Sequence, residues 1–165
     1  KDKGKINAQK RAAYTARTLR EHAGHGILYL SDVGNGGNLD VNFVCRLDRE
    51  LYSVITDDIQ TDEVIITDQQ LAHIRQRHPD ISDIVLHQLT EIITDPDYII
   101  DTDRPNTANI LKRLTINEKE YQLVLRLKTK ADPKSFKNSI ITLMTVNEKR
   151  FKQYLRNRKI LYKRG

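Results

Sequence analysis

Two histidines on one predicted helix are the first residues of this 165-residue chain that could perform acid–base chemistry. They are His73 and His78, in the segment LAHIRQRHPD. On a helix, His73 and Arg77 lie four residues apart and project from one side, while His78 comes at the helix end before Pro79. Because histidine titrates near neutral pH, two of them in one cleft can act as general base and general acid. The alternative is that one of them, most simply His78, caps the helix or packs.

A basic strand offers the complementary chemistry. Strict alternation over residues 121–128 predicts one apolar face and one face that carries Arg126 and Lys128. Such cations can bind a scissile phosphate and stabilise the extra negative charge of its transition state, or they can simply keep an exposed face soluble. A suitable register would bring the Thr142 hydroxyl of the following strand close to Arg126. Alternation in that strand places three residues on one face: Ile140, Thr142 and Met144.

Two imidazoles, a cation and a hydroxyl are the groups that metal-independent RNA cleavage requires. The base deprotonates the 2'-OH, the acid protonates the leaving 5'-oxygen, and the cation holds the phosphoryl oxygens. A zinc site is disfavoured, because His73, His78 and Asp80 lack the i, i+4 ligand spacing and there is no cysteine support. A P-loop is also disfavoured, because the glycines of residues 34–37 are not followed by Lys and Ser/Thr. No cofactor is expected.

Charge is distributed unevenly along the chain. The net charge is +6, but residues 1–20 carry +6, residues 21–111 carry −12 and residues 112–165 carry +12. Clustered Lys and Arg favour a polyanion as partner, because they release counterions from phosphates. The alternative is a solvated charged surface without a partner.

Composition sets the class of protein. Hydrophobic residues make up 38% and charged residues 30% of the chain, and no apolar run is long enough to cross a membrane. Cys45 is the only cysteine, so intrachain disulfides and cysteine-rich metal sites are excluded. The first residues show neither a methionine nor a signal peptide, which suggests a fragment of a longer protein.

Hydrophobic periodicity predicts helices first and strands later. Residues 1–60 are expected to be an extension with a linker helix at 5–23 and short strands at 27–30, 41–47 and 51–55. A strand at 63–66 precedes Thr67-Asp68-Gln69-Gln70, which fits a capping box that begins a helix ending before Pro79. The later elements are a helix at 82–93, four strands at 98–102, 109–116, 121–128 and 139–146, a basic helix at 148–156 and a short strand at 160–162.

These elements predict an α+β fold, in which N-terminal helices pack on a four-stranded antiparallel sheet and a basic C-terminal helix follows. The short connections between the four strands favour an antiparallel meander.

Several segments together resemble a known nuclease group. They are HIRQRHPD, DPDYIIDT, NTANILKRL, EYQLVLRLKT, KNSIITLMTVNEKRF and YLRNRKILYK, within residues 64–164. The chain resembles the phage-associated branch (PBECR) of the barnase, EndoU, colicin and RelE-like nucleases (BECR). Such domains lie at the C-terminus of MuF-type phage head morphogenesis proteins and of polymorphic toxins. The resemblance implies a nuclease-like domain over residues 61–165.

The resemblance implies a ribonuclease toxin that acts without metal in the bacterial cytoplasm. It would cleave RNA, tRNA among the targets, to leave a 2',3'-cyclic phosphate, and an immunity protein would hold it inactive in its host. The basic charge of this chain favours an acidic immunity protein. The parent polypeptide would be a phage or toxin protein. By position, the resemblance assigns catalysis to His73, His78, Arg126 and Thr142. Further phosphate contacts are assigned to Lys128, Tyr154, Arg156 and Lys159. The alternative for Tyr154, Arg156 and Lys159 is that they only stabilise the last helix.

Two other function classes stay open on the sequence. The basic residues 112–165 could bind nucleic acid without catalysis, as part of a binding or head-assembly module. A nucleotidyl or ADP-ribosyl transferase toxin is the weaker alternative, because no convincing nucleotide-binding motif is present.

Overall fold

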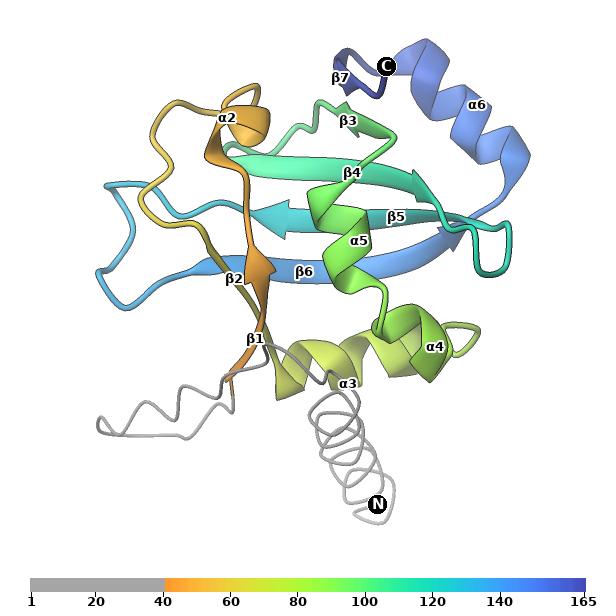
Figure 1. Ribbon diagram of the computed structural model, residues 1–165, viewed down its shortest axis with the longest axis horizontal. Helices are drawn as coiled ribbons and strands as arrows, with labels where there is room; N and C mark the ends of the chain where they lie inside the picture. Colours follow the sequence, from red (N-terminus) through yellow and green to blue (C-terminus); the bar gives the residue numbers. More distant parts are fainter. Residues whose placement is uncertain (1–40) are drawn as a thin grey trace.

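Seven strands form one mixed sheet in the computed structural model, which describes residues 41–165 (Figure 1). The strand order is β1-β2-β6-β5-β4-β3-β7. Strands β2 and β6 pair in parallel, and every other neighbouring pair is antiparallel. The strands are β1 (Val41–Arg46), β2 (Glu63–Thr67), β3 (Tyr98–Ile100), β4 (Thr107–Arg113), β5 (Glu120–Arg126), β6 (Asn138–Val146) and β7 (Ile160–Lys163). The helices are α2 (Arg49–Tyr52), α3 (Asp68–Arg77), α4 (Asp83–Leu86), α5 (Leu89–Thr94) and α6 (Glu148–Asn157).

The predicted fold of N-terminal helices on a four-stranded antiparallel sheet is wrong. The sheet has seven strands and is mixed, and apart from α3 and α6 the helices of residues 41–165 are short. The parallel β2–β6 pair joins segments more than 70 residues apart, which turn chemistry does not reveal. Buried Asn138 supports this junction, because its Nδ2 donates to the Thr61 carbonyl (2.7 Å) and its Oδ1 accepts from the Lys128 N–H (2.8 Å).

Local signals explain where two helices begin. The predicted capping box is confirmed: Thr67 Oγ1 accepts from the Gln70 N–H, and Gln70 Oε1 accepts from the Thr67 N–H. The strand predicted for 51–55 is wrong, because the Asp48 carboxylate accepts from two backbone N–H groups and caps the short helix α2 instead. The helix predicted for 82–93 is divided into α4 and α5, and each piece buries apolar side chains.

The hydrophobic core lies between α5 and one face of the sheet, which we call the core face. Figure 1 shows α5 crossing in front of the central strands. Alternate residues of these strands, such as Ile110 and Leu123, are fully buried together with Ile92 and Ile93 of α5. The Tyr52 hydroxyl donates to the Ile93 carbonyl (2.7 Å), so α2 is part of the same core.

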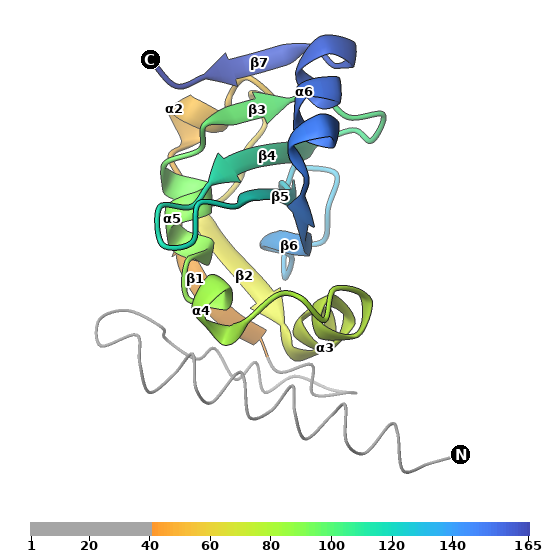
Figure 2. The ribbon, with the colours of Figure 1, turned by 90° about the vertical axis from the view of Figure 1, so that its right-hand side faces the viewer.

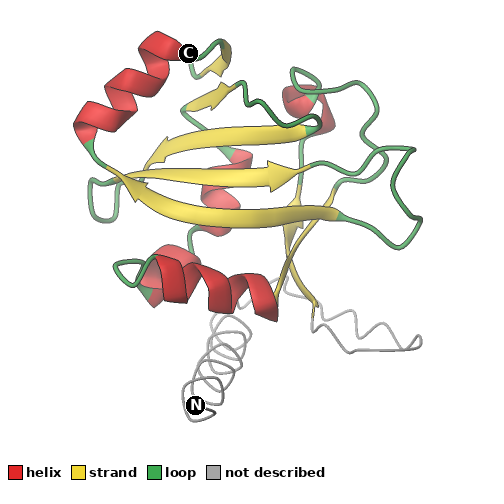
Figure 3. Cartoon of the chain, turned by 180° about the vertical axis from the view of Figure 1, so that it is seen from behind, coloured by secondary structure: helices red, strands yellow, loops and turns green. Residues whose placement is uncertain are grey.

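The opposite face of strands β3 to β6, which we call the open face, is flanked by two longer helices. Figure 2 shows α5 on one side of the sheet and both α3 and α6 on the other. Seen from behind in Figure 3, β4, β5 and β6 lie in front, with α6 and α3 at opposite edges. The helix α3 packs against β6 and β2. The open face of the central strands therefore lies between these two helices.

Two predictions fall outside the described part of the chain: the helix at 5–23 and the strand at 27–30. Among the helices of residues 41–165, none has the length and apolar character needed to cross a membrane.

Candidate active site on the open face

A cavity lined by both polar and apolar side chains lies on the open face. In register, Asn109 of β4 pairs with Val124 of β5, and Val124 pairs with Thr142 of β6. Their side chains form a row across three strands, and the chain segment between β3 and β4 closes the cavity. The cavity measures about 210 Å³ and is lined by Thr102, Arg104, Asn109, Val124, Ile141 and Thr142.

A β-bulge directs Thr142 into this row. Leu125 pairs with Ile140 and Val124 pairs with Thr142, so Ile141 is one extra residue in β6. The bulge reverses the alternation, with Ile140 in the hydrophobic core and Thr142 on the opposite face. The prediction that Ile140 and Thr142 share a face is therefore wrong. Bulges of this kind are common beside active sites, where they re-aim one side chain.

Two buried amides on this face have polar atoms without partners. Within residues 41–165, Asn109 Oδ1 and Gln122 Oε1 accept no hydrogen bond, although the two residues are only 9% and 6% exposed. Gln122 pairs with Leu111, so it lies one row along the strands from Asn109. Leaving a buried acceptor unsatisfied costs about 1–3 kcal/mol. Such groups are more easily explained as preparation for a ligand than as a contribution to stability.

Arg104 is held over the cavity by a clamp between the β3–β4 segment and the end of α6. The Arg158 guanidinium donates to both carboxylate oxygens of Asp103 (2.9 and 3.3 Å), and its hydrogen bond and charge lower the pKa of that carboxyl. Two further hydrogen bonds of 3.0 Å join Asp101 to Lys159. The Asp101 N–H donates to the Lys159 carbonyl, and the Lys159 N–H donates to the Asp101 carboxylate. The Arg104 guanidinium itself forms no ion pair with any of residues 41–165. It is therefore a cation available to a ligand.

Arg126 lies one row from Thr142 but is already engaged. It pairs with Thr107 and Ser139 across the strands, and its guanidinium donates to Asp132 (3.0 Å) and to the Leu127 carbonyl. Asp132 also accepts from the Thr129 N–H, and this hydrogen bond, with a contribution from the Arg126 charge, lowers the pKa of the Asp132 carboxyl. Arg126 thus shapes the loop after β5.

Lys128, predicted to bind substrate, helps to hold the same loop. Its Nζ donates to the Lys134 carbonyl (2.8 Å). This basic loop also exposes Phe136. It lies where β5 ends, beyond the Arg126 row.

The two histidines lie on α3 and do not line the cavity. His73 is exposed, whereas His78 is half-buried as the C-terminal cap of the helix, its N–H donating to the Ile74 carbonyl (2.7 Å). Asp80 follows closely and accepts from the Thr145 hydroxyl (2.5 Å), which fastens the end of this helix to β6. The structure therefore places both histidines on a helix alongside the strand that carries Thr142.

The predicted phosphate-binding residues Tyr154, Arg156 and Lys159 lie on α6 or directly after it. The Tyr154 hydroxyl accepts from Arg150 Nε (2.9 Å), and the Arg150 guanidinium also lies over the Tyr154 ring (5.4 Å). Arg156 lines a shallow basic hollow of about 380 Å³ on this helix, together with Lys149, Lys152 and Leu155. Lys159 contributes its backbone to the clamp that positions Arg104. These residues form a basic flank beside the cavity and do not enter it.

Sequence reasoning missed three residues of this site: Arg104, Asn109 and Gln122. In the sequence, Arg104 lies in one of the short connections between predicted strands, next to Pro105. Alternation places Gln122 on the same strand face as Arg126, but nothing else in the sequence marks it as a site residue. A polar residue in the middle of an otherwise apolar strand is the signal that could have found the two amides. Alternation assigns such a residue to the face that carries other polar residues.

No group of three or more His, Cys, Asp and Glu residues within residues 41–165 is arranged to hold a metal ion. The donors that line the cavity are the Arg104 guanidinium and the Thr142 hydroxyl, and the Asn109 amide lies beside them. The arrangement can therefore bind an anion and donate hydrogen bonds to it.

Comparison with known proteins assigns the chain to a family. The family described as phage-Barnase-EndoU-ColicinE5/D-RelE like nuclease 2 matches residues 43–163, which include the cavity, its flanking helices, α2 and most of β1. No curated protein and no solved structure matches the chain. The match covers most of the sequence and confirms the resemblance inferred from its motifs, so the chain belongs to this family of phage-associated nucleases.

Proposed function

We propose that this nuclease is an endoribonuclease and that it cleaves RNA in the cavity of the open face without a metal ion. The 2'-OH would attack the adjacent phosphate and leave a 2',3'-cyclic phosphate. The observation that carries the proposal is the lining of the cavity. The Arg104 guanidinium without an ion pair among residues 41–165, the Thr142 hydroxyl and the Asn109 amide, whose oxygen has no partner among these residues, surround one space.

The cavity suits a phosphate that gains negative charge. A guanidinium donates two parallel hydrogen bonds to phosphoryl oxygens and stabilises the extra charge of the transition state. The Thr142 hydroxyl supplies another donor from the opposite wall. We therefore assign the scissile phosphate to Arg104 and Thr142, with Arg126 one row away as a second cation once RNA competes with Asp132 for it.

His73 and His78 are our candidates for proton transfer. Both lie on α3, whose C-terminal end is fastened to β6 through Asp80 and Thr145. RNA lying across the open face would pass this helix. Exposed His73 is the better candidate, because His78 also serves as the helix cap.

The basic surroundings support RNA as the polyanion. Lys128 at one end of the open face, and Tyr154, Arg156 and Lys159 along α6, would contact phosphates outside the cleavage site. We extend the proposal to a toxin domain of a phage or polymorphic-toxin polypeptide that acts on RNA, tRNA among the targets, in the bacterial cytoplasm. An acidic immunity protein would bind its basic surfaces, because electrostatic complementarity speeds capture.

The test is incubation of the purified protein with total bacterial RNA in EDTA, with fragment ends identified chemically. The wild type should produce cyclic phosphate ends. The changes His73→Ala, Arg104→Ala and Arg126→Ala should each slow cleavage by about 100-fold or more, the usual loss for an acid–base or charge-stabilising group. The matched control is Arg49→Ala on α2, an exposed arginine that does not line the cavity, which should cleave at the wild-type rate.

Three results would contradict parts of this proposal. RNA that is bound but never cut would favour the non-catalytic binding module. Cleavage that needs a divalent metal would exclude the proposed mechanism. Equal cleavage by the wild type and His73→Ala would remove that histidine from the reaction.

A further inference from the structure

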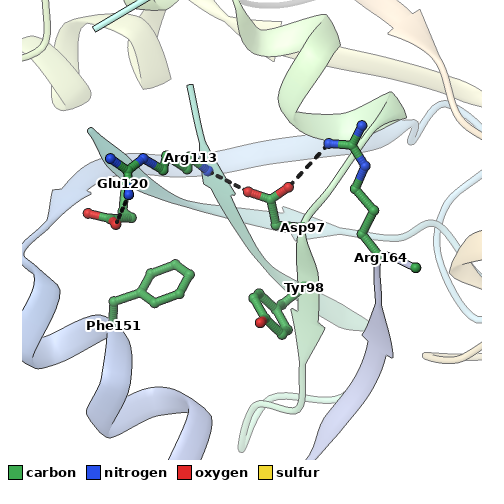
Figure 4. A pocket seen from close by; sticks show the side chains of 7 residues that line it. Asp97, Tyr98, Arg113, Glu120, Phe151 and Arg164 are labelled. Atoms are coloured by element: carbon green, nitrogen blue, oxygen red, sulfur yellow. Dashed lines mark hydrogen bonds and ion pairs between the residues drawn. The ribbon is translucent and has the colours of Figure 1, made fainter. Parts of the chain in front are cut away.

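A second cavity lies on the same face of the sheet, beneath α6. It measures about 350 Å³, within the range of about 300–1,000 Å³ typical of small-ligand sites. Figure 4 shows its side chains, which come from β3, β4, β5, α6 and the residues after β7. The six labelled lining residues are Asp97, Tyr98, Arg113, Glu120, Phe151 and Arg164.

One wall of this cavity is aromatic. Tyr98 and Phe151 are both half-buried, and their rings meet edge to face with centroids 5.9 Å apart. Figure 4 shows the two rings on one side of the space and the charged groups on the other. An aromatic wall that stays accessible to solvent can stack against the face of an unpaired nucleobase.

The opposite wall carries a donor beside an acceptor. Arg113 and Glu120 pair across β4 and β5, and their charged groups approach to 3.7 Å, which is longer than a hydrogen bond. Arg113 is 58% exposed and also lies near Glu148 at the start of α6. Asp97 is engaged, because it accepts from the Arg113 N–H (2.7 Å) and pairs with Arg164 (3.5 Å). Within residues 41–165, neither the Arg113 guanidinium nor the Glu120 carboxylate takes part in a hydrogen bond, so both groups can form hydrogen bonds to a ligand.

We propose that this cavity binds one unpaired nucleobase of the RNA, with a preference for guanine; this inference rests on the proposed function. Guanine presents two adjacent N–H donors to a carboxylate and an oxygen acceptor to a guanidinium, and the other bases do not combine these on one edge. The base stacks on Phe151 and Tyr98 while Glu120 and Arg113 bind its edge.

The two cavities lie along the same strands. The pair Arg113–Glu120 is four residues from the row of Asn109 and Val124, which corresponds to about 13 Å along a strand. An extended single strand can therefore place a base beneath α6 while a phosphate a few nucleotides away occupies the first cavity. The second cavity would then select where the RNA is cut.

Binding of short single-stranded RNA by the full chain tests this proposal. Hexamers with 2'-O-methyl groups cannot be cleaved by 2'-OH attack, so their dissociation constants report recognition apart from chemistry. We expect a hexamer with one guanine among adenines to bind about tenfold more tightly than the all-adenine hexamer at the same salt concentration. Phe151→Leu should weaken binding of the guanine hexamer by about tenfold, because stacking is lost. Glu120→Gln should abolish the preference for guanine.

The matched control is Phe43→Leu on β1, at the far edge of the sheet, which should bind RNA like the wild type. Thermal unfolding checks that each variant is folded. If Phe151→Leu is unstable, the nearly isosteric Glu120→Gln still tests the proposal through the preference for guanine. Equal binding of guanine and adenine hexamers by the wild type would overturn the proposal, as would unchanged binding by folded Phe151→Leu.

Cleavage of the matching unmodified hexamers separates the two proposals. Guanine-dependent binding without cleavage would leave the base site standing and refute the ribonuclease. The opposite result is that the hexamers are cleaved while Phe151→Leu and Glu120→Gln change neither binding nor the choice of cut site. That result would support the ribonuclease and refute the base site.

Discussion

Alternate residues of strands β4 and β5 point to opposite faces of the sheet, and the two faces differ in how their buried groups are satisfied. On the core face, Ile110, Leu123 and Leu125 are fully buried among other apolar side chains. On the open face, Asn109 and Gln122 are almost as buried, yet each leaves an amide oxygen without a partner among residues 41–165. The core face stabilises the fold. The open face contributes less stability, because its buried amide oxygens stay available to a ligand. The difference therefore indicates which side of the sheet is used for function.

Thiol labelling should show the largest contrast between the two faces. Burial raises the pKa of Cys45, which lies in the core, to about 12. The reactive thiolate is then about a thousandfold scarcer at pH 8 than for an ordinary cysteine. The change Val124→Cys places a thiol in the open-face cavity, and Ellman's reagent should modify it far faster than Cys45. Equal rates would show that the cavity is closed or the core is open.

A cavity made on the core face should cost stability. Leu123→Ala removes a fully buried side chain, and we expect the free energy of unfolding to fall by about 3 kcal/mol, more than a hundredfold in the folding equilibrium. Urea denaturation measures this change. The folded fraction should still cleave RNA. If the folded fraction lost cleavage, the core face could not be assigned to stability alone.

A similar change on the open face should act in the opposite direction. Asn109→Leu replaces an unpartnered buried amide by an apolar side chain of comparable size, so we expect the free energy of unfolding to rise by about 1 kcal/mol. Cleavage of RNA should fall at the same time. Urea denaturation and the cleavage assay on the same preparation check both signs, and lower stability together with normal cleavage would assign Asn109 to structure.

The smallest effect is expected at the loop after β5. The pKa of Asp132 is lowered in the folded protein, so its contribution to stability is present in full above the unfolded value of about 3.9 and is lost as the pH falls through the folded value. Asp132→Asn should therefore destabilise the protein at pH 6, and its difference from the wild type should shrink towards pH 3. A difference that does not change with pH would mean that the charge of Asp132 plays no part.

Much of the local structure could be predicted from the sequence because its causes are local. The Thr67 and Gln70 capping box lies within four residues, and the strands of the central meander are marked by alternation and short turns. The parallel pairing of β2 with β6 could not be predicted, because it depends on packing and on buried Asn138 rather than on a nearby turn.

The candidate site could be predicted only in part, for a related reason. Thr142 was selected and lines the cavity, but one extra residue in β6 changes the face of every residue after it, so alternation placed Ile140 beside it wrongly. Arg104 belongs to a turn in the sequence. Its position over the cavity depends on contacts that the neighbouring Asp103 and Asp101 make with Arg158 and Lys159, more than 50 residues away.

The clamp between the β3–β4 segment and the end of α6 also has a consequence for synthesis on the ribosome. Residues before 158 can form the other walls of the cavity, but Arg158 and Lys159 fix the segment that carries Arg104 only after they have left the exit tunnel. Because translation adds roughly 5–20 residues per second, the nascent nuclease would remain incomplete while most of its sheet is already made. The site is thus among the last parts of the fold to be completed during synthesis.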